Sequence, residues 1–181
     1  MLKIDDTVFV LVDVQGKLAQ LMYEKKPLFD NLQILVKAMQ VMDIPIVWVE
    51  QVPEKMGATI PELTALLDTK TPIPKSSFSC WGEPEFQKRL AATGRPNILL
   101  AGIETHVCIY QTVRDLINED HYVEVVADAV SSRTLRNREI GIDRIKACGA
   151  GVTSTEMILL ELLGSADHPL FKNVLACILG K

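Results

Sequence analysis

The sequence is poor in the residues that mark metal centres and disulfide frameworks. Its 181 residues include three histidines and four cysteines. Cys80, Cys108, Cys148 and Cys177 form neither a CxxC pair nor a zinc-finger spacing. Free thiols in a reducing compartment are therefore expected, without structural zinc or disulfides.

Long apolar runs and clustered positive charge are also absent. No stretch approaches 18 uncharged apolar residues, and the opening residues MLKIDDTVFVLVD carry acids where a signal peptide needs bases. The 19 lysines and arginines are spread along a chain of net charge -4, which leaves no basic stripe for nucleic acid. We therefore expect a cytoplasmic protein with neither a membrane nor a nucleic-acid partner.

The composition favours one globular domain over residues 1–181. Hydrophobic residues make up 48% of the chain and charged residues 23%, and a chain of this length can bury about 70% of its unfolded surface. No repeat, low-complexity tract or interdomain linker interrupts it.

Short apolar runs alternate with stretches of helical periodicity, the pattern of a parallel sheet covered on both faces. The strands are expected at 7–14, 45–50, 96–102 and 122–128, with weaker ones ending at Lys75 and at 150–155. The helices are expected at 27–43, 61–67, 83–92, 105–119, 137–148, 155–163 and from about 169. The prediction is a single-domain, three-layer α/β/α fold with right-handed crossovers.

In such folds ligands bind beyond the carboxyl ends of the strands. Four reactive residues follow predicted strands: Asp13, Lys75, Cys108 and Asp128. Asp13 is either a loop or capping acid, or a general base whose pKa is set by a nearby cation. Lys75 is a surface charge on composition alone, but Pro72 and Pro74 hold its approach extended.

Cys108 differs from the other cysteines in its expected position. Cys80, Cys148 and Cys177 are read as buried filler. Cys108 comes near the first turn of a helix, where free N–H groups favour a thiolate, and a nearby lysine would lower its pKa further. His106, two positions away, would point elsewhere on a helix and is read as a wall or packing residue. Asp13 is then the best-placed proton acceptor.

The chain resembles the isochorismatase-like cysteine hydrolase superfamily. The resemblance is carried in order by VLVDVQGKL (10–18), PKSSFSCW (74–81), LLAGIETHVCIYQT (99–112) and VVADAVSSR (125–133). VEQVPEKMGATIPEL (49–63) and GIETHVC are most similar to the isochorismatase domain-containing subgroup. The resemblance implies a Rossmann-like, six-stranded parallel sheet.

The resemblance also implies a catalytic triad of Asp13, Lys75 and Cys108, in which the thiolate attacks a carbonyl carbon and forms an acyl-enzyme. It implies a cis peptide joining Ile103 to Glu104, which would place the Glu104 and Cys108 N–H groups as an oxyanion hole. The substrate pocket would be lined by Gln15, Gln51, Phe78, Trp81 and Thr105, unless these side chains only pack.

Two departures narrow the activity that the resemblance implies. Metal-dependent relatives carry histidine ligands after the second strand, and residues 49–63 contain none, so neither a metal nor another cofactor is expected. Members that hydrolyse vinyl ethers can lack the cysteine, so Cys108 favours C–N or related cleavage in a small amide or ureido compound.

Two other functions stay open at this point, a non-catalytic binding or assembly protein and a redox-responsive thiol protein with Cys80 as a possible resolving partner. Family members are usually oligomeric. A homo-oligomer is therefore expected, in which the apolar stretch 169–181 either forms an interface or packs on its own sheet.

Overall fold

A computed structural model describes residues 2–67 and 71–180; Met1, residues 68–70 and Lys181 lie outside it. It contains one six-stranded sheet in which every neighbouring pair of strands is parallel. The strand order is β3-β2-β1-β4-β5-β6. The strands are β1 Thr7–Val12, β2 Ile46–Gln51, β3 Ile73–Lys75, β4 Asn97–Ile103, β5 Tyr122–Ser131 and β6 Gly151–Thr153. The predicted Rossmann-like parallel sheet is confirmed.

The central strand β1 is buried along its whole length because both faces of the sheet are covered. Side chains alternate between the faces of a strand. Phe9 and Leu11 accordingly belong to one core, and Val8, Val10 and Val12 belong to the other.

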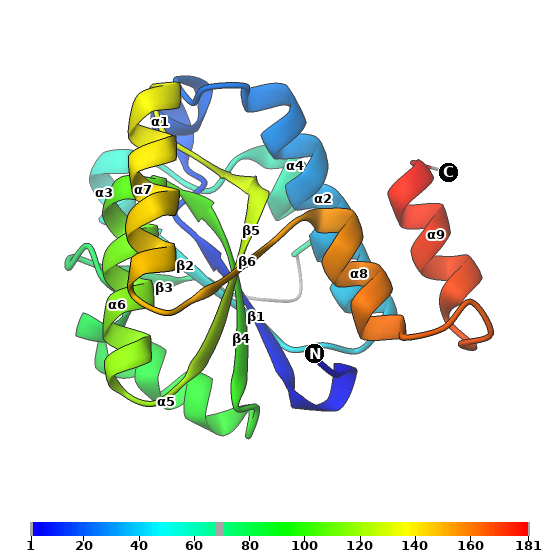
Figure 1. The fold of residues 1–181 in the computed structure, drawn as a ribbon. Helices are drawn as coiled ribbons and strands as arrows, with labels where there is room; N and C mark the ends of the chain where they lie inside the picture. The colour runs from blue at the N-terminus through cyan, green and yellow to red at the C-terminus, as the bar shows by residue number, and fades with distance from the viewer. Residues whose placement is uncertain (1, 68–70, 181) are drawn as a thin grey trace.

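Helices cover both faces of the sheet (Figure 1). On one side lie α5 Pro84–Ala92, α6 Tyr110–Asn118 and α7 Leu135–Ala147, and on the other α2 Lys25–Val41, α8 Thr155–Leu163 and α9 Phe171–Leu179. Short helices α1 Gly16–Gln20, α3 Pro53–Met56 and α4 Pro61–Thr64 follow the carboxyl ends of β1 and β2, and 3-10 turns span Ile4–Asp6 and Cys80–Gly82. The predicted three layers are confirmed.

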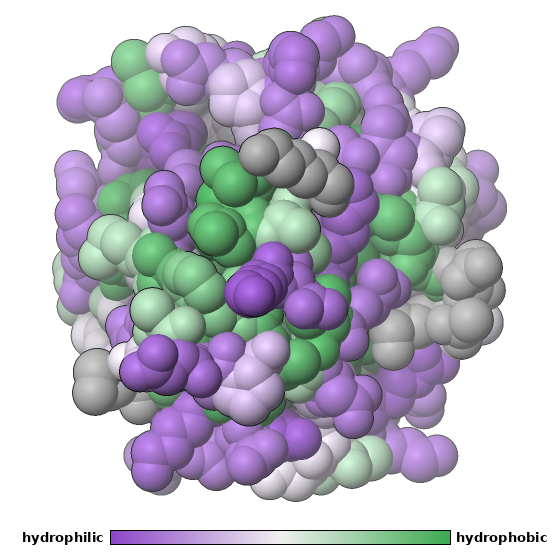
Figure 2. All heavy atoms as spheres, turned by 90° about the vertical axis from the view of Figure 1, so that its right-hand side faces the viewer, coloured by the Kyte–Doolittle hydropathy of each residue, from purple (hydrophilic) through white to green (hydrophobic). Residues whose placement is uncertain are grey.

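Helix α9 packs on α2 and α8, but only Val174 of this helix is fully enclosed. Figure 2 shows apolar atoms gathered on the face that α8 and α9 present to the viewer. Met157, Leu160 and Leu179 are among the large apolar side chains that remain exposed on these two helices. Within residues 2–67 and 71–180, no helix is both long enough and apolar enough to cross a membrane.

Three local features differ from the prediction. Helices α1 and α3 were not predicted, because four or five residues are too few to show a helical period. The expected helix at 105–119 begins as a π-helical turn over Thr105–Ile109. Strand β5 continues to Ser131, so Asp128 does not end it.

Asp128 was predicted as one of four reactive residues that follow strands, and the structure corrects this prediction. Its Oδ1 accepts hydrogen bonds from the Thr155 N–H and hydroxyl, both at 2.8 Å. These contacts tie β5 to the start of α8, which gives Asp128 a structural role.

Candidate active site

Three predicted residues converge at the point where the order of successive strands in the sheet reverses. The chain leaves β1 towards β2 on one side, while β4 is its neighbour on the other. Such switch points open a crevice at the carboxyl ends of the strands. Asp13 follows β1, Lys75 ends β3, and Cys108 lies in the turn after β4.

The glycine before this turn allows the two central strands to approach closely. Gly102 has φ of 126°, and a Cβ atom there would lie 2.1 Å from the Val12 carbonyl oxygen. Only glycine fits this position without displacing β1. Gly102 thus helps to bring Cys108 to the same rim as Asp13.

Lys75 is buried, and its amine contacts four oxygen atoms. Its Nζ lies 2.7 Å from Asp13 Oδ2. It also donates hydrogen bonds to Gln51 Oε1 and to the carbonyl oxygens of Ser77 and Phe78, each carbonyl at 3.1 Å. Burial by itself lowers the Lys75 pKa, but the charge of Asp13 and its other neighbours outweighs that effect and raises the pKa. The amine is therefore a fixed cation.

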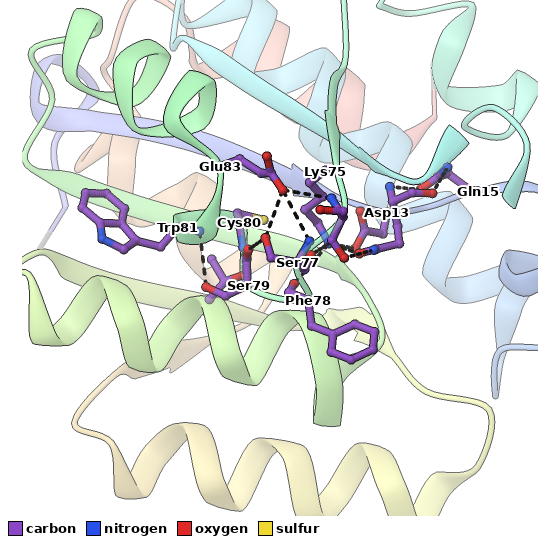
Figure 3. Close-up of polar contacts among 12 residues, drawn as sticks. Asp13, Gln15, Lys75, Ser77, Phe78, Ser79, Cys80, Trp81 and Glu83 are labelled. Atoms are coloured by element: carbon purple, nitrogen blue, oxygen red, sulfur yellow. Dashed lines mark hydrogen bonds and ion pairs between the residues drawn. The ribbon is translucent and has the colours of Figure 1, made fainter. Parts of the chain in front are cut away.

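The segment after Lys75 is held by Glu83, as Figure 3 shows. Glu83 Oε1 accepts hydrogen bonds from the N–H groups of Ser76 at 2.9 Å and Ser77 at 3.4 Å. The Ser76 N–H bond is the main cause that lowers the Glu83 pKa. Glu83 therefore fixes the turn whose carbonyl groups hold Lys75.

Asp13 presents one carboxylate oxygen that is not used by the fold. Oδ2 faces Lys75, whereas Oδ1 is buried and accepts no hydrogen bond of ordinary geometry from the described residues. Burial raises the pKa of Asp13 above its usual range, and the charge of Lys75 opposes the increase. This environment makes Asp13 a stronger base than a solvated carboxylate.

Cys108 and Asp13 both line one cavity, and 8% of the Cys108 surface is exposed. Burial is the main cause that raises the pKa of its thiol, followed by the charge of Asp13; Lys75 lowers it by less. The prediction of a lowered pKa was wrong: Asp13 was expected nearby, but the sequence did not show how deeply the sulfur is buried, and burial together with the Asp13 charge outweighs Lys75. At neutral pH the free site holds a thiol rather than a thiolate.

The residue that follows β4 also supplies a free donor. The peptide bond between Ile103 and Glu104 is cis, the isomer that the resemblance implied. The Glu104 N–H donates no hydrogen bond to another described residue. The Glu104 carbonyl accepts from Val107 and Ile109 at the start of the π-helical turn.

These groups surround a cavity of about 160 Å³. Its lining contains Asp13, Gln15, Leu18, Gln51, Met56, Phe78, Ile103, Glu104, Val107 and Cys108. Gln15 serves mainly to brace the wall, since its amide group bonds to the Gln51 N–H and carbonyl and to the Gly57 carbonyl. Phe78 is 56% exposed.

Two predicted pocket residues lie elsewhere, which corrects the predicted lining. Trp81 follows a turn in which its N–H donates to Ser79 Oγ, and its ring packs edge-on against His121 at 5.7 Å between centroids. In Figure 3 it points away from Asp13. Thr105 is fully buried, and its methyl group packs against Gly141 of α7.

His106 and Cys80 lie outside the cavity lining, in agreement with the prediction that His106 is a wall or packing residue and Cys80 a buried filler. His106 Nδ1 lies 2.9 Å from Ser132 Oγ. Cys80 is sealed in the core with no exposed surface, and burial is the main cause that raises its pKa to about 12. No cluster of three or more His, Cys, Asp or Glu side chains among the described residues could hold a metal ion.

Sequence reasoning missed Leu18, Met56 and Val107 as lining residues, and Glu83 and Arg133 as supporting ones. Leu18 and Met56 lie on α1 and α3, the short helices that periodicity cannot detect. A carboxylate directly before Pro84 at the start of α5 was a signal for a helix-start position at Glu83. No local signal pointed to the contact of Arg133 with Glu104.

Comparisons with known proteins identify the family. The family model "Isochorismatase domain" matches residues 7–157. Isochorismatase domain-containing protein 2 of Danio rerio is 36% identical over 93% of this chain and 84% of its own length. Protein 1 of the same organism is 35% identical over 93% of this chain, which spans only 59% of that relative. A secreted isochorismatase effector of Phytophthora sojae is 33% identical, over 93% of this chain and 82% of its own length.

Solved structures share the whole fold. The MAR1 ribonuclease from Caenorhabditis elegans has a TM-score of 0.92 and 34% identity, covering 98% of this chain and 92% of that one. The Escherichia coli YcaC product, described as an octameric hydrolase of unknown specificity, has a TM-score of 0.88 and 25% identity, covering 98% and 86%. With the family model and these relatives in agreement, the chain belongs to the isochorismatase domain family.

Proposed function

We propose that this protein is a cofactor-independent cysteine hydrolase of a small molecule, which cleaves an amide, ureido-type or related bond through an acyl-enzyme. The observation that supports this most is the buried ion pair of Lys75 with Asp13, which lines the same cavity as Cys108. A packed core gains little from such a pair, since desolvating two charges costs several kcal/mol per ion. A reaction that needs a base and a fixed cation explains it.

The first half of the reaction removes the leaving group. Asp13 takes the thiol proton as the Cys108 sulfur attacks the carbonyl carbon. The carbonyl oxygen becomes an oxyanion, which the N–H groups of Glu104 and Cys108 stabilise. When the C–N bond breaks, protonated Asp13 gives its proton to the departing nitrogen, and the acyl group stays on the sulfur.

The second half restores the enzyme. Asp13, again a carboxylate, takes a proton from water as the water oxygen attacks the thioester carbon. The C–S bond then breaks, Cys108 regains its proton from Asp13, and the acid leaves. Lys75 keeps its proton throughout, because four oxygen contacts hold it; it stabilises Asp13 and the sulfur when either is negative.

RNA hydrolysis is a second candidate, which rests on the ribonuclease description of the Caenorhabditis elegans structure. The charges of this chain oppose it. The net charge is -4, and the cavity lining contains two acids, Asp13 and Glu104. Binding of a phosphate backbone depends on exposed lysine and arginine side chains. An amide or ureido substrate fits this cavity better.

The sharpest test compares two buried thiols, Cys108 and Cys80, which both influence the pKa of Lys75. Small amides and ureas are supplied to the wild type and to Cys108→Ala and Cys80→Ala, with ammonia or amine release as the readout. We expect Cys108→Ala to lose about 10⁴-fold or more of kcat, since removal of a nucleophile leaves only binding and the oxyanion hole. Cys80→Ala keeps the activity of its folded fraction.

Mass spectrometry separates this function from the two non-hydrolytic readings. An acyl adduct on Cys108 that decays in water supports the hydrolase. An intact wild type that neither releases product nor forms an adduct with any substrate would favour a binding or assembly protein. A reversible Cys80–Cys108 disulfide after peroxide treatment, without hydrolysis, would favour a redox-responsive thiol.

A homo-oligomer and a cytoplasmic location remain predictions. The apolar face of α8 and α9 and the octameric description of the YcaC product support an assembly. Light scattering at several protein concentrations tests it. Because a relative from Phytophthora sojae is described as secreted, cell fractionation is the test of the cytoplasmic location.

A further inference from the structure

Glu104 is the second acidic residue of the cavity lining, and its backbone N–H is the predicted oxyanion donor. Its side chain is 9% exposed and its residue lines the cavity. Oε2 accepts hydrogen bonds from the Arg133 N–H at 3.0 Å and from Nε at 3.1 Å. Oε1 accepts no hydrogen bond from the described residues, and it is accessible to solvent. One oxygen is therefore anchored and the other is free.

Negative charge dominates the described lining of the cavity. Asp13 and Glu104 both line the cavity as acids. Lys75, the buried cation, has its amine occupied by four oxygen contacts. Arg133 is 55% exposed and contacts Glu104 from outside the lining. The remaining lining residues are neutral, so the described lining carries two acidic residues and no lysine or arginine.

We propose that Glu104 determines substrate specificity: its free oxygen selects molecules that carry an N–H donor or a positive charge on the acyl part, and rejects those with a carboxylate there. This inference rests on the proposed hydrolase. The accessible Oε1 can accept a charge-assisted hydrogen bond from a substrate N–H, which is stronger than a bond between neutral groups. A carboxylate at the same place adds repulsion from both acids.

A purely structural role would also use the Arg133 contact. In that case Glu104 would fix the segment after β5 to the segment after β4, and its removal would loosen the site for every substrate alike. The two roles therefore differ in one measurable property. Only a specificity role changes the preference between ligands of different charge.

The primary test uses alkylating reagents that differ mainly in charge and need no known substrate. Rates of iodoacetamide and iodoacetate reaction at Cys108 are measured by peptide-resolved mass spectrometry in the wild type, Glu104→Gln and Arg133→Gln. Cys148 is partly exposed and outside the cavity lining, so it serves as the internal reference in each sample. The readout is the iodoacetate-to-iodoacetamide rate ratio at Cys108 divided by that at Cys148.

We expect this normalised ratio to be well below one in the wild type. Removing one negative charge in Glu104→Gln should raise it about tenfold, whereas Arg133→Gln, which removes the balancing cation, should lower it about threefold. An unchanged ratio in Glu104→Gln, including one in which both rates fall together, would overturn the inference. So would a wild type that favours iodoacetate.

Hydrolysis of matched amides separates this inference from the proposed function. Butanamide, 3-aminopropanamide and malonamate have similar lengths and carry a neutral, a positive and a negative end. We expect kcat/KM to favour 3-aminopropanamide over malonamate, with the preference reduced about tenfold in Glu104→Gln. Charge-selective alkylation without any amide or urea turnover contradicts the hydrolase alone. Turnover of all three amides without charge preference contradicts the specificity role alone.

Discussion

The two sides of the cavity differ in how completely their polar groups are paired. The clamped side consists of Gln51, which lines the cavity, and of Lys75, Ser77 and Glu83, which do not; hydrogen bonds join the Lys75 amine, the Gln51 amide and the turn that Glu83 holds. On the open side, formed by Asp13, Glu104 and Cys108, a carboxylate oxygen and a backbone donor have no partner among the described residues.

This difference separates positioning from reactivity. An unpaired buried polar group costs about 1–3 kcal/mol, so several such groups in one place need another source of stability. The dense bonding of the clamped side and the fully buried strands beneath it supply that stability. The open side keeps groups free to meet a substrate, and the clamped side keeps them in register.

The largest expected effect comes from Lys75→Met, which removes the cation of the clamped side and leaves Asp13 buried without a partner. We expect a loss of about 3–5 kcal/mol in the free energy of unfolding near neutral pH. Urea unfolding measures it, and Lys55→Met, at an exposed position, is the control with an effect within about 0.5 kcal/mol.

The pH dependence of this variant gives an independent check. Burial already raises the Asp13 pKa, and the loss of Lys75 raises it further. A raised folded-state pKa contributes stability that is present below the unfolded value and lost as pH rises. The destabilisation should therefore be smaller at pH 5 than at pH 8, and the acid limb of kcat/KM should move to higher pH. Equal destabilisation at both values would contradict the pairing of Asp13 with Lys75.

A smaller effect is expected from Phe78→Ala, at the border of the two sides. Phe78 lines the cavity but is half exposed, so its loss removes about 1 kcal/mol of apolar contact and raises KM for an apolar amide about fivefold. Trp81→Phe is the matched control, because the Trp81 ring packs on His121 and is not part of the lining. A change in KM from Trp81→Phe alone would reverse this assignment.

The smallest effect is expected from Glu83→Gln, which weakens the clamp without removing its shape. The hydrogen bond from the Ser76 N–H is the main cause of the lowered Glu83 pKa. A lowered acid pKa contributes stability above about pH 4.5, and that contribution is lost as pH falls through the folded-state value. Solvent screens this site, so we expect about 0.5–1 kcal/mol at pH 7 and a smaller difference from wild type near pH 3.

Glu85→Gln provides the comparison for Glu83. Glu85 lies two residues away and pairs with Arg89 on the surface of α5, at 2.8 Å between Oε1 and Nε. Chemical denaturation at pH 3 and pH 7 should show a pH-dependent loss for Glu83→Gln that exceeds the loss for Glu85→Gln. Equal losses would mean that the clamp has no more weight than a surface ion pair.

Much of the sheet could be predicted because its signals are local. Strands β1, β2 and β4 each contain a continuous apolar run, and the alternation of these runs with helical stretches predicted a parallel sheet. The short helices α1 and α3 could not be predicted in this way because they are too short to show a helical period, and the end of β5 could not because it depends on pairing with β4. Asp128 illustrates the error, since only the position of Thr155 shows that its carboxylate serves α8.

For the site, the sequence by itself determined the order of the strands' apolar runs and hence which reactive residues stand at their ends: Asp13, Lys75 and, just beyond β4, Cys108. The tertiary structure alone decided how these groups are paired and charged. It packed Trp81 against His121 and away from the cavity, tied Lys75 to four oxygens, and buried the Cys108 thiol near a carboxylate, which raised its pKa. The physical reason is that hydrogen bonding, burial and charge act through space, between residues that the linear sequence keeps far apart.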